Sequence, residues 1–314
     1  MKLILAITAI IVATNAMAAT NRAFVSNERS DSVSVVDILT NKVIKTVQVG
    51  KRPRGVGISP DGNEVYVAIS ADNAIAVLDP AKMEVIRTFA SGDDPEAFAI
   101  HSNGNLYISN EEDAMASVYD PRTGALLATI DVGIEPEGVA VAPDGTRVAV
   151  TSESTNLVHI IGVPEHTIQN NVLVGARPRS VVFSNDSQII YVTAEIGGEV
   201  KKIAADTGTL IKKTTLPDQN AKPKDVLLSR DGKNLYVAGG RANKIFILDA
   251  ESLDHKNSIP VGKRVWGLAL SRDGSTLYTT DGLDHQVTVI DTKSEKVKAV
   301  IKVGKFPWGI ALDD

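Results

Sequence analysis

A glycine that recurs about every 42 residues constrains this chain more than any other feature of its sequence. Val-Gly pairs, with Ser-Gly once, recur at Gly50, Gly92, Gly133, Gly175, Gly262 and Gly304. Most neighbouring glycines in this series lie 41 or 42 residues apart, and the interval of 87 before Gly262 holds two units plus about three extra residues near Asn220. A fixed period of this length is typical of repeat architectures, so one structural unit is repeated along most of the chain.

Each repeat contains four short segments that have the composition of β-strands. An apolar run such as 55–59 ends at an Asp-Gly or Asn-Gly pair, and an aromatic, β-branched run such as Tyr66-Val67 follows. A third run ends in Asp, as at 74–79, and a fourth follows a polar turn, as at 85–89. The Asx-Gly pairs favour tight hairpins, in which both central residues need a positive φ. Four strands per unit and no helical period predict the blades of a β-propeller.

The number of repeats predicts how the propeller closes. The first strand type follows Pro53, Pro95, Pro136, Pro178, Pro223, Val265 and Pro307. The chain begins with the second strand type and ends with the first, at 309–312. We therefore predict an all-β, seven-bladed β-propeller with four-stranded antiparallel blades, closed by three N-terminal strands plus the C-terminal strand. Such closure removes an open edge strand. The alternative is an open solenoid with both ends incomplete.

The first 18 residues differ from the repeats. Lys2 precedes an apolar run over 3–13, and Ala16-Met17-Ala18 follows. This pattern is typical of a secretory signal peptide, cleaved after residue 18 or one residue later. The apolar run is shorter than the roughly 20 residues that span a bilayer. We expect a periplasmic or secreted protein in which 19–314 form a single propeller domain, with no membrane span after cleavage. The alternative is an uncleaved N-terminal anchor.

Composition excludes several classes of function. The chain has no cysteine, which excludes thiolate catalysis, disulfide scaffolds and cysteine-based metal sites. It has 33 Lys and Arg against 38 Asp and Glu, for a net charge of −5, and contains no basic block. Nucleic-acid binding relies on clustered basic residues, so we expect no nucleic-acid partner. We expect a monomer.

The second strand type carries a resemblance to a known family. The strings YVAI (66–69), YISN (107–110), YVTA (191–194) and YVAG (236–239) resemble the YVTN-type β-propeller repeat. Seven such units behind a signal peptide are similar to the exported propeller family associated with PQQ-dependent alcohol oxidation and an adjacent ABC transport system. The resemblance implies a periplasmic partner, such as a PQQ dehydrogenase or an ABC transport component. It also implies PQQ as a candidate ligand, although no cofactor is required.

One repeat position varies strongly while the surrounding strand pattern stays constant. Connections that enter the first strand and leave the second lie at the same end of a propeller, because these strands are antiparallel. The residues after the Pro position should therefore ring the mouth of the central channel as a binding rim. They are Arg54, Glu96, Glu137, Arg179, Lys224, Trp266 and Trp308. The alternative is a solvated rim of self-paired arginines and glutamates.

The only two tryptophans of the chain occupy this ring, 42 residues apart. Arg264 and Lys305 stand beside them in the sequence. Aromatic faces and neighbouring cations suit a flat anionic ligand, and PQQ is such a molecule. Alternatively, the two rings fill a tapering channel or pack on each other.

A second ring follows the second strand of four blades. It contains Glu28, Glu111, Glu153 and Glu195. These carboxylates either converge on a hard metal or as acid–base groups, or point outward and keep the loops soluble. The five histidines are scattered in the repeat, and no haem-attachment, nucleophile-elbow or phosphate-loop motif occurs. We therefore assign no catalytic residue and no metal ligand.

These observations favour an exported, non-enzymatic propeller that binds a partner protein or a small anionic ligand at the channel mouth. The resemblance places it as an accessory to a periplasmic PQQ-dependent oxidation pathway. One alternative is a metal-dependent, lactonase-like propeller hydrolase that uses the glutamate ring. Another is an extracellular surface or adhesion module, because YVTN-type repeats resemble those of archaeal surface proteins.

Overall fold

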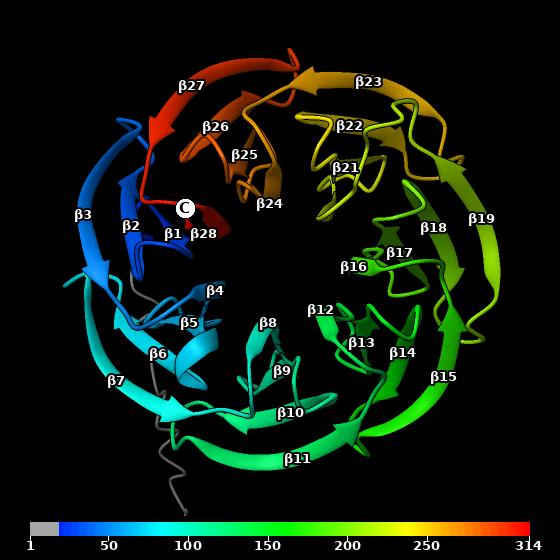
Figure 1. The fold of residues 1–314 in the computed structure, drawn as a ribbon, viewed down its shortest axis with the longest axis horizontal. Coiled ribbons are helices and arrows are strands. Elements are labelled where there is room, and N and C mark those ends of the chain that lie inside the picture. The colour runs from blue at the N-terminus through cyan, green and yellow to red at the C-terminus, as the bar shows by residue number, and fades with distance from the viewer. Residues whose placement is uncertain (1–18) are drawn as a thin grey trace, which may run out of the picture.

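Seven four-stranded antiparallel sheets surround a common axis in the computed structural model, which describes residues 19–314 (Figure 1). Each sheet is one blade, and in blades 2 to 7 the chain runs from the innermost to the outermost strand before it enters the next blade. The predicted seven-bladed β-propeller is confirmed. The predicted signal peptide over 1–18 lies outside the described residues.

The blades are numbered from the N-terminus. Blade 1 contains β1 (Arg22–Asn27), β2 (Ser32–Asp37), β3 (Lys42–Gln48) and β28 (Pro307–Asp313). Blades 2 and 3 contain β4 (Pro53–Ile58), β5 (Val65–Ile69), β6 (Ala74–Asp79), β7 (Glu84–Ala90), β8 (Pro95–Ile100), β9 (Leu106–Asn110), β10 (Met115–Asp120) and β11 (Ala125–Asp131). Blades 4 and 5 contain β12 (Pro136–Val141), β13 (Arg147–Ser152), β14 (Leu157–Gly162), β15 (Thr167–Leu173), β16 (Pro178–Phe183), β17 (Ile189–Ala194), β18 (Glu199–Ala204) and β19 (Leu210–Thr215). Blades 6 and 7 contain β20 (Val226–Leu228), β21 (Asn234–Ala238), β22 (Lys244–Asp249), β23 (His255–Pro260), β24 (Val265–Leu270), β25 (Thr276–Asp281), β26 (Gln286–Asp291) and β27 (Lys296–Lys302).

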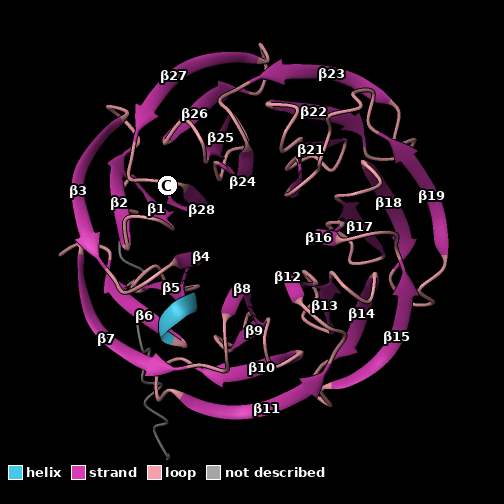
Figure 2. Ribbon diagram, viewed as in Figure 1, coloured by secondary structure: helices cyan, strands magenta, loops and turns pink. Residues whose placement is uncertain are grey.

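Helical structure is minimal. Within residues 19–314 the one helical segment is the 3-10 turn η1 (Ser70–Asp72), which follows β5 (Figure 2). No helix in this part of the chain is long and apolar enough to cross a membrane.

The hydrophobic core is divided among the blade interfaces. Phe24 and Val33 of blade 1 pack with Val65 and Val67 of blade 2 in one of seven such clusters. The second and third strands of a blade, such as β5 and β6, are buried along almost their whole length because a neighbouring blade covers each face. The outermost strands, such as β7, alternate between exposed and half-buried residues. This arrangement leaves the axis to the innermost strands and the polar side chains at their ends.

The predicted closure is confirmed. β28 pairs antiparallel with β1, with Leu312 opposite Ala23 and Ile310 opposite Val25. The last strand thereby becomes the innermost strand of blade 1, and the ends of the described chain lie in one sheet (Figure 1). The ring formed by residues 19–314 therefore has no unpaired inner strand.

The Asx-Gly turns differ from the expected geometry. Gly62 has a φ of 74°, but Asp61 before it does not have a positive φ. The N–H of Ser59 donates to the carbonyl of Glu64 at 2.8 Å, which closes a four-residue loop instead of a two-residue one. Asp61 Oδ1 accepts from Ser59 Oγ at 2.6 Å and from the N–H of Asn63 at 3.1 Å. The prediction of two positive-φ residues was wrong, because these side-chain hydrogen bonds stabilise a longer loop with one left-handed glycine.

Candidate functional site

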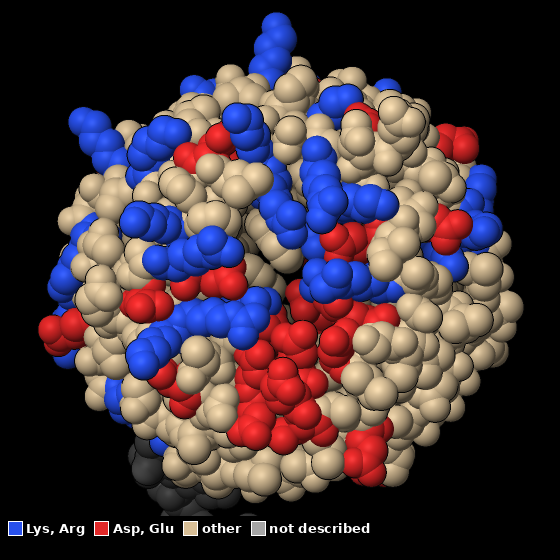
Figure 3. All heavy atoms as spheres, in the orientation of Figure 1, with Lys and Arg blue, Asp and Glu red and all other residues tan. Residues whose placement is uncertain are grey.

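The first ring of predicted residues lies at one end of the channel. Arg54 of blade 2 pairs with Glu96 of blade 3, and Arg179 Nη1 of blade 5 lies 2.9 Å from Glu137 Oε1 of blade 4. Acidic side chains gather over blades 3 and 4 on this face, while basic side chains spread over the others (Figure 3). The structure thus brings neighbouring ring positions into contact across the blade boundaries.

A hydroxyl on the second strand of five blades holds the backbone of this ring. Thr151 Oγ1 accepts from the N–H of Gly138 at 2.8 Å and donates to the carbonyl of Arg179, in the next blade, at 3.1 Å. Equivalent pairs of contacts are made by Ser26, Ser109, Thr193 and Thr280, which donate to the carbonyls of Arg54, Glu137, Lys224 and Trp308. Sequence analysis missed these hydroxyls. Their signal is the third position of strings such as YVTA and YISN.

The hydroxyl contact can be tested at Thr151. We expect Thr151→Val to lower the free energy of unfolding by about 1–3 kcal/mol, because the buried N–H and carbonyl lose their partner while the side-chain shape is kept. Thr151→Ser keeps the hydroxyl and should cost less. Urea denaturation of both variants measures the difference. An unchanged free energy of unfolding in Thr151→Val would show that the hydroxyl contributes nothing to stability.

Blades 1, 2 and 3 share a network centred on Arg54. Its guanidinium pairs with Glu96 and lies 3.2 Å from Glu28 Oε1, and Arg52 lies 3.0 Å from Asp94. Burial, together with the charge of Glu137, raises the pKa of Glu96 well above its ordinary value. Burial alone would lower the pKa of Arg54, but the surrounding glutamates outweigh it and raise that pKa. The arginines here are thus paired within the protein, while the surroundings of Glu96 favour its neutral form.

Blades 4, 5 and 6 share a second network centred on Arg179. The guanidinium lies 2.7 Å from Glu195 and 2.9 Å from Glu137, and it also pairs with Glu153. Lys224 Nζ lies 2.6 Å from Glu195 Oε2. Burial would raise the pKa of Glu195, but Arg179 and Lys224 lower it to about 2. Burial, with the nearby charge of Arg179, lowers the pKa of Lys224 to about 7 despite the attraction of Glu195.

The low pKa of Lys224 predicts a pH dependence of stability. Above about pH 7 the folded chain has released this proton, whereas the unfolded chain keeps it up to about pH 10.5. Because the unfolded state then binds more protons, stability should rise with pH across this window. We expect wild type to gain free energy of unfolding relative to Lys224→Met between pH 7 and pH 10. Chemical denaturation at several pH values measures this difference, and parallel curves would contradict it.

The two tryptophans stack on each other. The ring centroids of Trp266 and Trp308 are 6.2 Å apart, with an angle of 28° between the planes. Lys224 Nζ lies 4.3 Å and Arg264 Cζ 5.2 Å from the Trp266 ring. Burial and the neighbouring charge of Arg241 lower the pKa of Arg264. Of the two cations expected beside the tryptophans, only Arg264 reaches them. Lys305 is exposed and meets Ser30 Oγ through its backbone N–H.

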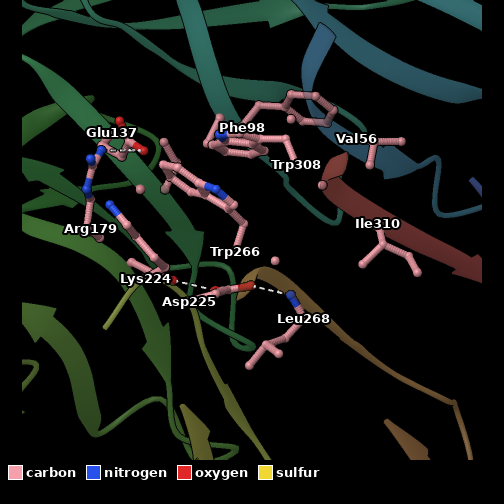
Figure 4. Close-up of a pocket in the computed structure, with 17 residues that line it drawn as sticks. Val56, Phe98, Glu137, Arg179, Lys224, Asp225, Trp266, Leu268, Trp308 and Ile310 are labelled. Carbon is pink, nitrogen blue, oxygen red and sulfur yellow. Dashed lines mark hydrogen bonds and ion pairs between the residues drawn. The ribbon is translucent and has the colours of Figure 1, made fainter. Parts of the chain in front are cut away.

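A cavity of about 200 Å³ lies beside this indole pair. Apolar atoms of Trp266, Trp308 and Phe98 line it together with the polar side chains of Arg179 and Lys224. Trp266 lies between Trp308 and Lys224, and Arg179 and Lys224 both point toward Glu137 (Figure 4). Trp308 Nε1 is buried and has no hydrogen-bond partner among the described residues. The cavity therefore combines aromatic walls with two cations, Arg179 and Lys224, and the unpaired Trp308 N–H is enclosed beside it.

The second ring does not converge as a set of four carboxylates. Glu28, Glu153 and Glu195 are engaged by arginines, and Glu195 also by Lys224. The outward orientation offered as an alternative does not apply to Glu153 and Glu195, which are buried. Glu111 instead has carboxylate oxygens within 4.8 Å of those of Asp94 and Glu96.

Asp225 is a further residue of the cavity that sequence analysis missed. Its Oδ1 accepts from Ser180 Oγ of blade 5 at 2.7 Å, and its Oδ2 accepts from the N–H of Leu268 of blade 7 at 2.8 Å. Burial raises its pKa, although these hydrogen bonds oppose the shift. The carboxylate joins three blades beside Lys224, where β20 is only three residues long. A usable signal was the unique Asp at a repeat position that elsewhere holds Gly, Ala or Ser.

The sequence pattern of the YncE-like β-propeller family matches residues 3–314. The chain belongs to this family. It is 26% identical over 263 residues to the seven-bladed β-propeller protein Rv1057 of Mycobacterium tuberculosis (strain ATCC 25618 / H37Rv), which covers 69% of this chain and 65% of that protein. It is 26% identical over 188 residues to the uncharacterized protein YncE of Salmonella typhi, covering 57% of this chain and 52% of that protein.

A third relative of this YncE-like chain is the antigen Lp49 of Leptospira interrogans serogroup Icterohaemorrhagiae serovar copenhageni (strain Fiocruz L1-130). The two are 25% identical over 206 residues, which cover 58% of this chain and 45% of the antigen. The chain thus spans about half the length of Lp49 and of the Salmonella protein.

Solved structures share the fold of this YncE-like propeller. Kuenenia stuttgartiensis hydrazine synthase superposes with a TM-score of 0.79 at 23% identity, over 88% of this chain and 94% of that chain. A putative 6-phosphogluconolactonase from Bacteroides fragilis NCTC 9343 superposes with a TM-score of 0.80 at 19% identity, over 94% and 99%. At these identities the likeness shows the fold alone.

Proposed function

We propose that this YncE-like propeller is a binding protein that holds a small organic anion in the cavity at the channel mouth. The observation that carries the proposal is a group of hydrogen-bond donors around the indole pair whose positive charge or N–H is not fully balanced by protein acceptors. These donors are Lys224, which lines the cavity, Arg264, which lies over the Trp266 ring outside the cavity lining, and the buried N–H of Trp308.

The electrostatics of the site favour an anion. The pKa values of Lys224 and Arg264 are both lowered, which means that their surroundings disfavour positive charge. A bound carboxylate would relieve this cost and accept charge-assisted hydrogen bonds. Stacked aromatic walls favour a ligand with a flat apolar part. The most suitable ligand is therefore a small, planar carboxylate.

The cavity volume limits the role of PQQ. Drug-sized ligands occupy pockets of about 300–1,000 Å³, whereas this cavity measures about 200 Å³. Trp266 and Trp308 also contact each other, so no slot for a tricyclic ring exists between them. PQQ does not fit this cavity with the side chains as they lie.

Intrinsic fluorescence offers a direct test, because Trp266 and Trp308 are the only tryptophans of the chain. We expect benzoate to change tryptophan emission and to raise the melting temperature, since it binds only the folded state. Arg264→Gln should weaken both effects. Arg272→Gln, an exposed arginine in the turn between β24 and β25, should leave them unchanged. If no small carboxylate moves emission or melting temperature, the proposal is wrong.

A second candidate function, recognition of a partner protein, is favoured by the charge distribution of Figure 3. Acidic residues of blades 3 and 4 oppose basic residues elsewhere on one face, which suits electrostatic orientation of a partner. A test by charge reversal should use exposed Lys263 and Lys305. Arg54, Arg179 and Lys224 are unsuitable, because each belongs to a largely buried ion-pair network. Retention of a purified PQQ dehydrogenase, lost in the reversed variant, would support this role, and unchanged or absent retention would not.

The cellular setting is part of the same proposal. The leader-like sequence and the repeat resemblance support an exported, periplasmic location and an accessory role in PQQ-dependent oxidation. Osmotic-shock fractionation of cells that express the full chain tests the location. Recovery of the protein with cytoplasmic markers would contradict it.

A further inference from the structure

Lys224 is one of the residues that line the channel cavity, and its amine lies against the Trp266 ring. The residue is only 3% exposed, and its Nζ lies 2.6 Å from Glu195 Oε2 and 4.3 Å from the centre of the Trp266 ring. We infer that Lys224 is a reactive amine that captures small carbonyl-bearing anions, such as glyoxylate, as an imine. This inference rests on the proposed anion site.

The surroundings of Lys224 are those that make a lysine nucleophilic. Desolvation in an apolar pocket and a neighbouring cation both favour the neutral amine. Trp266 supplies the aromatic wall, and Arg179 supplies the cation. The negative groups that face the amine are Glu195 of blade 5 and Glu137 of blade 4, and they oppose this effect only in part. Near neutral pH a large fraction of this amine is therefore neutral, unlike that of an exposed lysine.

Imine formation between Lys224 and the carbonyl compound needs neither an oxidant nor a reductant. The nitrogen lone pair attacks the carbonyl carbon, and the π electrons of the C=O bond move to oxygen. A proton passes from nitrogen to that oxygen, which gives a carbinolamine. Loss of water then forms the C=N bond, so amine and carbonyl yield imine and water. The carboxylate of the same ligand would lie beside Arg179, the other cation that lines the cavity, which explains a preference for anionic carbonyl compounds.

Access to the amine depends on Trp266. Lys224 Nζ is buried, and the Trp266 ring covers it, whereas Trp266 itself is half-buried. A carbonyl group can reach the nitrogen only when the indole turns aside. Trp266→Ala should therefore speed imine formation at Lys224.

The experiment traps the imine in the full wild-type chain. The protein is incubated with glyoxylate and cyanoborohydride at pH 7, and peptide mass mapping compares Lys224 with Lys222. Lys222 is a matched internal control, because it enters the same blade and its Nζ meets the carbonyl of Ile196 on the surface. We expect labelling at least about tenfold faster at Lys224, from the difference in neutral amine at this pH. The preference should disappear in urea. Equal labelling of the two lysines in the folded chain would overturn the inference.

Further arms separate this inference from the proposed function. Propanal carries a carbonyl without a charge, and labelling of Lys224 by propanal as fast as by glyoxylate would overturn the anionic class of ligand. Glycolate carries the charge without the carbonyl, and it should raise the melting temperature if the anion site exists. Labelling by glyoxylate without any effect of glycolate or benzoate would support the reactive amine and reject the anion-binding proposal. Stabilisation by glycolate without preferential labelling would support the anion-binding proposal and reject the reactive amine.

An unchanged labelling rate in Trp266→Ala would overturn the gating role of the indole.

Discussion

Arg179→Met is expected to lower the free energy of unfolding by about 3–5 kcal/mol, the cost of breaking a buried ion-pair network. The Arg179 side chain is 9% exposed and pairs with Glu137, Glu153 and Glu195, which are themselves 2–7% exposed. Methionine fills much of the same space but leaves these carboxylates without their shared cation. Urea denaturation at pH 7 measures the loss.

Arg177 is the matched control for this prediction. It also contacts Glu153 and Glu195, but its side chain is 47% exposed. Solvent screens an exposed pair, so Arg177→Met should cost only about 0–1 kcal/mol. Similar losses for the two variants would mean that burial does not determine the strength of this network.

Removal of residues 307–314 should abolish cooperative unfolding. The deletion takes away β28, the innermost strand of blade 1, and with it the pairing of Ile310 with Val25 and the carbonyl bonded by Thr280. It also exposes β1 as an open edge next to the apolar face of blade 2, which favours association between chains. The loss should be comparable with a typical total stability of about 5–15 kcal/mol. Thermal melting followed by circular dichroism, with analytical ultracentrifugation, measures both effects.

Deletion of Asp314 alone is the control for this truncation. Its carboxylate accepts one hydrogen bond, from the N–H of Arg272 at 2.8 Å, and it lies after the last strand. We expect nearly unchanged melting in this variant. If the chain that lacks 307–314 also melted cooperatively as a monomer, closure through β28 would not be needed for stability.

Local sequence patterns predicted the fold because every blade repeats the same alternation of strands and turns. The spacing of Gly50, Gly92 and their equivalents set the number of units, and the strand types at the two ends set the closure. The turn geometry at Asp61-Gly62 was mistaken, since the hydrogen bonds of Ser59 and Asp61 that select the longer loop are not visible in a dipeptide.

The ring position was also predictable, because residues at one repeat position meet at one end of the channel. Which charged side chains are buried and paired could not be predicted from the sequence. Arg179 and Lys224 are both basic residues at the same repeat position. In the structure, however, Arg179 pairs with three glutamates, whereas the pKa of Lys224 falls to about 7. Lys305 and Arg264 stand at comparable sequence distances from a tryptophan, but only Arg264 lies over an indole.

The sequence by itself determined the repeat, the number of blades and the closing strand, since these follow from periodic patterns that each segment carries locally. Only the tertiary structure decided which charges are compensated, that Trp266 stacks on Trp308, and that Asp225 joins three blades. The physical reason is that burial and pairing depend on neighbours from other blades, at distances along the chain that no local pattern specifies.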